Sequence, residues 1–305
     1  MNSNDNGANV NPMIENHTAR FAPSPTGALH LGHAYAAFVA QAAAGMGGRF
    51  LLRMEDTDTG RVRSEYEQAV YDDLRWMGLA WEEPVMRQSE RSAAYLEALE
   101  KLRAKDLIYP CFCTRKEIEA EFRASVSAPH GPDGPLYPGT CKHLSAEDLA
   151  TRMEAGDSHA LRLHVDRAMA SLPTDLTFME YGAGPDGDTG LIKVALTMFG
   201  DAVLARKDAV ASYHLAVVVD DAAQGITLVT RGNDLFPSTH LHRMLQALLD
   251  LPTPEYLHHE NVCDETGKRL AKRHDAMALA TLRADGKTPK AVRDMLPALP
   301  GVLLD

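Results

Sequence analysis

The sequence has few cysteines, few aromatic residues and no long apolar run. Its 305 residues include four cysteines and two tryptophans, and 6% of them are aromatic. So few cysteines do not make the disulfide framework of a small secreted protein. No run approaches the length of a membrane span, and the polar, asparagine-rich residues 1–16 lack a signal-peptide pattern. We therefore expect a cytoplasmic protein with no membrane partner.

Basic residues are outnumbered by acidic ones. The chain has 31 Lys and Arg against 42 Asp and Glu, which gives a net charge of −11 at pH 7. Nucleic-acid-binding surfaces are usually basic because phosphate contacts dominate affinity, so this balance argues against an RNA partner. Local basic clusters still allow a basic track, and they lie at residues 101–105, 115–116, 206–207 and 268–273.

The first third of the chain alternates between strand and helix patterns. Short apolar runs and amphipathic helical patterns follow one another at residues 18–22, 34–44, 50–54, 66–77 and 92–103. Such alternation predicts an α/β fold with a parallel sheet and helical crossovers.

The alternation stops and later returns. Residues 111–200 hold three of the four cysteines and two glycine-rich stretches, which is typical of an insertion. Apolar runs at 214–219 and 226–230 then predict two strands, the first opened by Tyr213 and closed by Asp220 and Asp221, and residues 239–249 predict a helix. We expect a disordered tail at 1–17, a first catalytic half at 18–110, an inserted subdomain at 111–200, a second half at 201–262, and a mobile basic loop with a short helical segment at 263–305.

The most informative stretch is the junction of the first strand and helix, which carries His30-Leu31-Gly32-His33. A helix N-terminus offers unpaired backbone N–H groups and a partial positive charge, so it suits phosphate. Two imidazoles there can stabilise the charge that develops when the α-phosphate of ATP is attacked. A histidine at this position can also simply cap the helix, and the four residues alone leave both interpretations open.

Two further sites follow predicted strands. Glu55 lies in the acidic run 53–58, which could hold an ammonium group or magnesium or could be a solvated turn. Arg231 follows the strand pattern at 226–230, where an arginine can grip a carboxylate with two hydrogen bonds or can be an ordinary surface residue. A basic stretch at 267–273 could neutralise a triphosphate or could be a solvated patch.

The cysteine spacing indicates structural zinc. Cys111 and Cys113 are followed by Cys141, and three thiolates in a cytoplasmic protein suit a tetrahedral site. Because imidazole is a commoner ligand than phenol, residue chemistry favours His130 or His143 as the fourth ligand. The alternative is that the cysteines are only buried thiols.

These motifs together resemble the class I aminoacyl-tRNA synthetases. Residues 20–33 are similar to the HIGH signature in the version of the glutamyl and glutaminyl branch. Residues 53–58 resemble its Arg-Ile-Glu-Asp-Thr-Asp string, and Tyr213 to Asp221 with 231–234 resemble Tyr-x-Leu-Ala-Val-Val-Val-Asp-Asp…Arg-Gly-x-Asp. Residues 269–273 resemble the KMSKS loop, with Arg269 and Ala271 departing from the pattern and Lys272 keeping its second lysine. The resemblance implies a Rossmann-like catalytic core with an inserted zinc-containing subdomain and a short C-terminal segment.

The resemblance also implies residue roles. ATP would be bound by His30, Gly32, His33 and Lys272, of which the two histidines and Lys272 are catalytic, with Mg²⁺ expected beside it. Glu55 would contact the amino group of L-glutamate, with Arg20 and Arg231 at its carboxylate, and the remaining substrate-binding residues would be Phe21, Ala22, Pro23, Ser24 and Tyr213. Zinc-binding members show Cys-x-Cys…Tyr-x-x-x-Cys, which implies Cys111, Cys113, Tyr137 and Cys141 as zinc ligands and leaves His143 as the alternative to Tyr137.

The chain also resembles the truncated, queuosine-modifying paralogues of this branch, since little sequence follows the basic loop. That resemblance implies ATP-dependent, tRNA-independent activation of L-glutamate to glutamyl-adenylate and transfer to queuosine in the anticodon of tRNA(Asp), by a monomer. Two alternatives remain: a minimal glutamyl-tRNA synthetase that charges a tRNA 3′ end, and a non-catalytic descendant that binds nucleotide or RNA.

Overall fold

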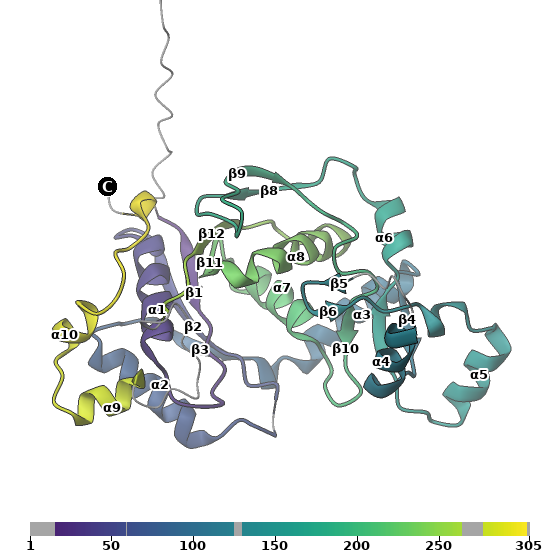
Figure 1. Cartoon of the computed structure of the whole chain (residues 1–305), viewed down its shortest axis with the longest axis horizontal. Coiled ribbons are helices and arrows are strands. Elements are labelled where there is room, and N and C mark those ends of the chain that lie inside the picture. The colour runs from purple at the N-terminus through teal and green to yellow at the C-terminus, as the bar shows by residue number, and fades with distance from the viewer. Residues whose placement is uncertain (1–15, 59, 125–129, 264–276, 304–305) are drawn as a thin grey trace, which may run out of the picture.

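The computed structural model describes residues 16–58, 60–124, 130–263 and 277–303. One end of the molecule is built on a parallel sheet of order β1-β2-β3 (Figure 1). Its strands are β1 (Thr18–Phe21), β2 (Arg49–Met54) and β3 (Glu82–Arg87). Three helices belong to this part of the chain, α1 (Leu31–Ala44), α2 (Ser64–Trp76) and α3 (Ser92–Ala104). The predicted strands and helices of the first third are therefore confirmed.

A second sheet continues beside the first. Its order is β11-β12-β8-β9, with β11, β12 and β8 parallel and β9 antiparallel. The strands are β11 (Leu228–Gly232), β12 (Glu255–His259), β8 (Thr177–Glu180) and β9 (Gly190–Lys193). The backbone N–H of Thr227 donates to the carbonyl of Thr18 at 3.0 Å, which joins the start of β11 to β1. The α/β class with a parallel sheet is confirmed.

The other end of the molecule is a small antiparallel sheet surrounded by helices (Figure 1). Its order is β10-β7-β4, formed by β4 (Ile108–Cys111), β7 (Ala160–Leu163) and β10 (Val203–Ala205). A short hairpin and three helices complete this part: β5 (His130–Gly131), β6 (Gly134–Pro135), α4 (Arg115–Ala124), α5 (Ala146–Glu154) and α6 (Val165–Ser171). In this sheet β4 spans the expected boundary at 110, β7 comes from the expected insertion at 111–200, and β10 comes from the expected second half at 201–262. The division of the chain into domains stays a prediction.

The predicted strand at 214–219 is wrong, because these residues form helix α7 (Tyr213–Ala223). The Ser212 hydroxyl caps the helix by accepting from the Leu215 N–H at 3.5 Å. Residues 215–218 are all buried, between α3 and α8 (Phe236–Leu248). A six-residue apolar run has no periodicity that separates a buried helix from a buried strand. The correction places Tyr213 in the first turn of a helix and puts Asp220 and Asp221 on its inner face, both buried.

The C-terminal part returns to the first sheet. Helices α9 (Leu279–Ala284) and α10 (Pro289–Arg293) lie beside α1 and α2 in Figure 1, and the Tyr35 hydroxyl donates to the Ala298 carbonyl at 2.9 Å. Ala278 forms a β-bridge with His30, and the Leu279 N–H donates to the Leu29 carbonyl at 2.8 Å. The chain therefore re-enters the described structure beside the HIGH-like motif. Of the tail expected at 1–17, residues 1–15 lie outside the described residues, whereas the His17 carbonyl accepts from the Arg49 N–H at 2.9 Å. The KMSKS-like residues 269–273, including Lys272, also lie outside the described residues.

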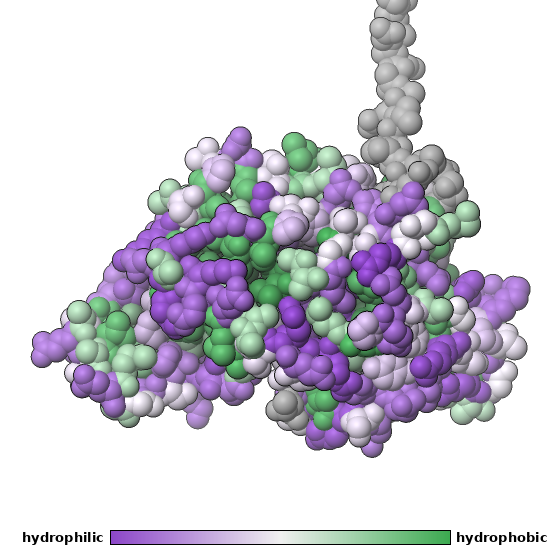
Figure 2. Space-filling model, turned by 180° about the vertical axis from the view of Figure 1, so that it is seen from behind, coloured by the Kyte–Doolittle hydropathy of each residue, from purple (hydrophilic) through white to green (hydrophobic). Residues whose placement is uncertain are grey.

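Polar residues cover most of the face seen from behind, and hydrophobic residues gather near its middle (Figure 2). Among the described residues, no helix combines the length and apolar character that crossing a bilayer requires.

Asp73 on α2 is a buried carboxylate that has few interactions to stabilise its negative charge. Its side chain is fully buried, neither oxygen accepts a hydrogen bond from the described residues, and the nearest cation is Arg283 of α9 at 3.5 Å. Burial raises the pKa of Asp73 to about 6, and the Arg283 charge only partly opposes this. The folded protein therefore holds this proton more tightly than the unfolded chain, so ionising Asp73 costs stability as the pH rises through 6.

We expect Asp73→Asn to increase the free energy of unfolding by about 2 kcal/mol at pH 8, and the gain to shrink as the pH falls toward 4. Urea unfolding at pH 8 and pH 4.5 measures the difference. Asp72→Asn, at an exposed neighbouring position, is the control and should change stability little at either pH. An Asp73→Asn gain that is equal at both pH values would contradict this explanation.

Candidate active site

A cavity of about 540 Å³ opens at the carboxyl ends of β1 and β2. Ser24, Glu55 and Tyr213, three of the predicted substrate residues, line it together with Arg206 and Asp208. The first two follow neighbouring parallel strands, and Tyr213 comes from the start of α7. Residues separated by more than 150 positions therefore meet at the edge of the sheet where α/β folds bind ligands.

His30 and His33 both cap helix α1. The Gly32 N–H donates to His30 Nδ1 at 3.1 Å, and the His30 N–H donates to His33 Nδ1 at 3.2 Å. The two ring centroids are 3.9 Å apart. A Cβ on residue 32 would lie 3.0 Å from the His30 ring, so glycine at this position leaves room for that ring. Because each Nδ1 accepts a hydrogen bond, each neutral ring carries its proton on Nε2. Capping and phosphate binding are thus compatible, because capping fixes both rings as Nε2 donors.

Asp221 of α7 binds two buried arginines from neighbouring strands. Arg20 donates to it through Nε at 2.9 Å and Nη2 at 3.2 Å, and Arg53 donates through Nη1 at 2.6 Å. Burial opposes the ionisation of Asp221, but the two guanidinium groups outweigh it and lower the pKa of this carboxyl. The Arg20 guanidinium also donates to the Thr230 carbonyl. Arg20 therefore already has a carboxylate partner in the protein.

Glu55 lines the cavity, and its side chain is mostly buried. Its carboxylate accepts from Arg53 Nη2 at 3.2 Å, and its backbone N–H donates to the Pro23 carbonyl at 3.0 Å. Burial raises the pKa of Glu55, and the charges of Arg53 and Arg20 act against the rise. A bound ammonium group would favour the ionised form further.

Phe21, Ala22 and Pro23, three further predicted substrate residues, are not among the residues that line the cavity. The Phe21 side chain packs in the core, and Ala22 and Pro23 are partly or fully buried, whereas Ser24 is exposed at the cavity. Any contact of Phe21 with a ligand would therefore pass through its backbone.

Arg231 is a buried cation whose hydrogen-bond partners are all neutral. It is 6% exposed, and no carboxylate of the described residues lies within 4.0 Å of its guanidinium. Its partners are Tyr213 Oη at 3.4 Å, Thr239 Oγ1 at 2.7 Å, His242 Nδ1 at 3.1 Å and His258 Nε2 at 3.0 Å. Unlike Arg20, this guanidinium is held in place without being paired to an anion.

His258 connects Arg231 to a buried carboxylate. His258 Nδ1 lies 2.6 Å from Glu180 Oε2, and Glu180 Oε1 accepts from two backbone N–H groups at 2.8 Å. Burial lowers the pKa of His258 to about 4, Glu180 opposes this and Arg231 adds to it. The ring is therefore neutral at pH 7, with its proton on Nδ1 and Nε2 accepting from Arg231. The sequence did not predict His258, Thr239 and His242 as partners of Arg231. A single histidine or threonine in a helix or strand does not indicate which residue of another element it will contact.

The three predicted cysteine ligands form a cluster. The sulfur atoms of Cys111, Cys113 and Cys141 all lie within 4.8 Å of one another. The Tyr137 hydroxyl is 3.4 Å from Cys113 Sγ and accepts from the Cys141 N–H at 2.8 Å. Three thiols and a phenol oxygen at this spacing fit a four-coordinate zinc. The alternative ligand His143 is exposed, and its ring is not part of the cluster; the His130 side chain is outside the described part of the chain.

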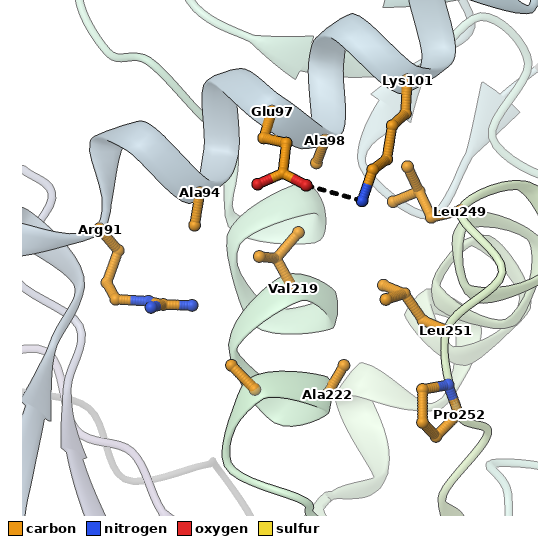
Figure 3. A pocket seen from close by; sticks show the side chains of 11 residues that line it. Arg91, Ala94, Glu97, Ala98, Lys101, Val219, Ala222, Leu249, Leu251 and Pro252 are labelled. Atoms are coloured by element: carbon orange, nitrogen blue, oxygen red, sulfur yellow. Dashed lines mark ion pairs between the residues drawn. The ribbon is translucent and has the colours of Figure 1, made fainter.

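A second type of pocket lies away from these residues. Figure 3 shows a pocket between α3, α7 and the segment after α8, where the Glu97–Lys101 ion pair is among the lining residues. Its floor is apolar, formed by Ala94, Ala98, Val219, Ala222, Leu249, Leu251 and Pro252. None of the predicted site residues lines this pocket, whereas Ser24, Glu55 and Tyr213 line the cavity at Glu55, which is therefore the candidate active site.

We expect about one zinc ion per chain and loss of most of it in Cys113→Ser, together with lower thermal stability, because a structural metal contributes to folding. Tyr137→Phe should weaken zinc retention against a chelator, and His143→Ala should leave it unchanged. Metal content by atomic emission measures both. Full zinc in Tyr137→Phe with loss in His143→Ala would make His143 the ligand.

The chain is similar to known proteins over most of its length. The family model for tRNA synthetases class I (E and Q), catalytic domain, matches residues 17–300. A glutamyl-Q tRNA(Asp) synthetase of Rhodobacter capsulatus is 47% identical over 280 residues, covering 91% of this chain and 98% of the relative. The protein of the same name from Nocardia farcinica is 44% identical, covering 91% and 82%.

Solved structures agree with this assignment. The crystal structure of a glutamate-tRNA synthetase from Elizabethkingia anophelis aligns with a TM-score of 0.69 and 30% identity, covering 84% of this chain and 52% of that one. The chain therefore belongs to the class I tRNA synthetase family of the glutamyl and glutaminyl branch, and within it to the ligases named glutamyl-Q tRNA(Asp) synthetases.

Proposed function

We propose that this protein activates L-glutamate with ATP, without tRNA, and transfers the glutamyl group to queuosine in the anticodon of tRNA(Asp). The observation that carries the proposal is Arg231, a buried guanidinium with neutral partners directly behind Tyr213, which lines the cavity. A substrate carboxylate would supply the anion that this cation lacks. The names of the relatives support glutamate as the amino acid and tRNA(Asp) as the acceptor.

The substrate amino group is assigned to Glu55, whose carboxylate lines the cavity. Ser24 and the backbone of residues 21–23 would complete the amino-acid site. Arg20 contributes a second positive charge nearby, although its pairing with Asp221 makes Arg231 the stronger candidate for the side-chain carboxylate. Neutral glutamine would leave the Arg231 charge without an anion, so the site should favour glutamate.

ATP is assigned to the N-terminus of α1. The Nε2–H groups of His30 and His33 would donate to phosphate oxygens, and Gly32 leaves room for the His30 ring beside the helix N-terminus. In the reaction, an oxygen of the glutamate α-carboxylate attacks the α-phosphorus, the bond to the β-phosphate oxygen breaks, and pyrophosphate leaves. Lys272 is proposed to neutralise the triphosphate, with Mg²⁺ as counterion. Ala278, further along the chain, forms a β-bridge with His30.

Zinc is proposed to have a structural role, since Cys111, Cys113, Tyr137 and Cys141 would fill four positions and leave none for a substrate. The segment 111–200 that carries these ligands is proposed as an inserted subdomain of the catalytic core. Acting on tRNA, the protein is proposed to work in the cytoplasm as a monomer.

The acceptor is tested with tRNA(Asp) whose 3′-terminal adenosine has been removed. Labelled glutamate should attach to the trimmed tRNA when it carries queuosine and should not attach to trimmed or intact tRNA(Asp) that lacks queuosine, because a base splayed from a single-stranded loop can enter an active site. Glutamate-dependent exchange of labelled pyrophosphate into ATP, without tRNA, is measured in parallel.

Two results would contradict the proposal. Attachment that needs the 3′ end and persists without queuosine would make the protein a minimal glutamyl-tRNA synthetase. Absence of pyrophosphate exchange, with the protein folded and loaded with zinc, would make it a non-catalytic descendant.

A further inference from the structure

A row of hydrogen bonds leads from Arg231 to the surface through two histidines. Arg231 Nη1 lies 3.1 Å from His242 Nδ1, His242 Nε2 lies 3.1 Å from His214 Nδ1, and His214 Nε2 lies 3.0 Å from Asp133 Oδ2. The four residues come from β11, α8, α7 and the turn between β5 and β6. The row therefore joins three separate elements to Arg231, a buried cation with no carboxylate of the described residues within 4.0 Å of its guanidinium.

Which atom donates and which accepts in each hydrogen bond of this row follows from the guanidinium at its inner end. A guanidinium is only a donor, so His242 Nδ1 must accept, and the proton of a neutral His242 must be on Nε2. That proton is donated to His214 Nδ1, which leaves the His214 proton on Nε2, directed at the Asp133 carboxylate. Each bond thus fixes the next, and one arrangement of protons satisfies all three contacts.

Burial supports a neutral His242. The residue is 3% exposed, and burial lowers the pKa of its imidazole well below the usual range, helped by the positive charge of Arg231. His214 is less buried, and Asp133 at the outer end is largely exposed. His242 is therefore the rigid inner member, and the outer members act on Arg231 only through it.

We infer that His242 is a positioning residue that holds Arg231 in the orientation needed for the substrate carboxylate, and that His214 supports it by fixing its tautomer. The inference rests on the proposed function, which assigns Arg231 to that carboxylate. His242 Nδ1 hydrogen-bonds to Arg231 among the proposed substrate residues, so losing this acceptor weakens glutamate binding and leaves ATP binding and the chemical step largely unchanged.

Two substitutions separate the two ring nitrogens. The carboxamide oxygen of His242→Asn lies near the position of Nδ1 and can still accept from Arg231, whereas His242→Gln reaches the position of Nε2 and loses that acceptor. In tRNA-free pyrophosphate exchange, we expect His242→Gln to raise the KM for glutamate about tenfold, with kcat and the KM for ATP within about twofold of the wild type. His242→Asn should restore the KM for glutamate to within about threefold of the wild type.

The matched control is His240, which is buried on the same helix and accepts from the Ala195 N–H at 3.0 Å. His240→Gln should lower the thermal stability without raising the KM for glutamate. Equal effects of Asn and Gln at His242, or an unchanged KM for glutamate in His242→Gln, would overturn the inference.

A readout independent of activity is the ¹⁵N spectrum of histidine-labelled protein at pH 7. We expect the His242 and His214 signals to be those of neutral rings protonated at Nε2, and the His242 tautomer preference to weaken in Arg231→Ala. A His242 ring protonated at Nδ1 would overturn the inference, whatever the exchange assay shows. Absence of glutamate-dependent exchange in the wild type would instead contradict the proposed function.

Discussion

The bridge from Asp221 to Arg20 and Arg53 is the interaction on which the rest of the site depends. Two fully buried guanidinium groups on neighbouring strands would be costly to bury without an anion, and Asp221 supplies it from a helix 168 and 201 positions away. The helix must therefore dock over the carboxyl ends of β1 and β2. Docked in this way, α7 brings Tyr213 from its first turn to the cavity and to Arg231.

The site thus contains arginines in two different states. Arg20 and Arg53 are neutralised by protein carboxylates and are structural in character, whereas Arg231 is surrounded by a phenol, a hydroxyl and two neutral imidazoles. Glu180 balances its charge only from the far side of the His258 ring. This arrangement keeps the guanidinium ordered and leaves its strongest kind of partner, a carboxylate, to be provided by a ligand.

Short sequence motifs predicted the parts of the candidate site whose residues lie close together in the chain. The turn after β1 and the capping histidines of α1 lie within one continuous stretch, and the cysteine cluster was predicted from the spacing of Cys111, Cys113 and Cys141. The helix α7 was predicted as a strand, because an apolar run in a fully buried element has no periodicity. The partners of Arg20 and Arg231 could not be predicted, since contacts across elements depend on docking, and the tautomers of His242 and His258 depend on those contacts.

The central claim is that Arg231 selects for a carboxylate, and calorimetric titration of L-glutamate and L-glutamine tests it most directly. Wild-type protein should bind glutamate at least tenfold more tightly, a difference of about 1.4 kcal/mol. In Arg231→Ala the preference should disappear, while Arg243→Ala, which removes a partly buried arginine bonded to the Thr177 carbonyl, should keep it. Equal affinity of the wild type for both amino acids, or an undiminished preference in Arg231→Ala, would contradict the account.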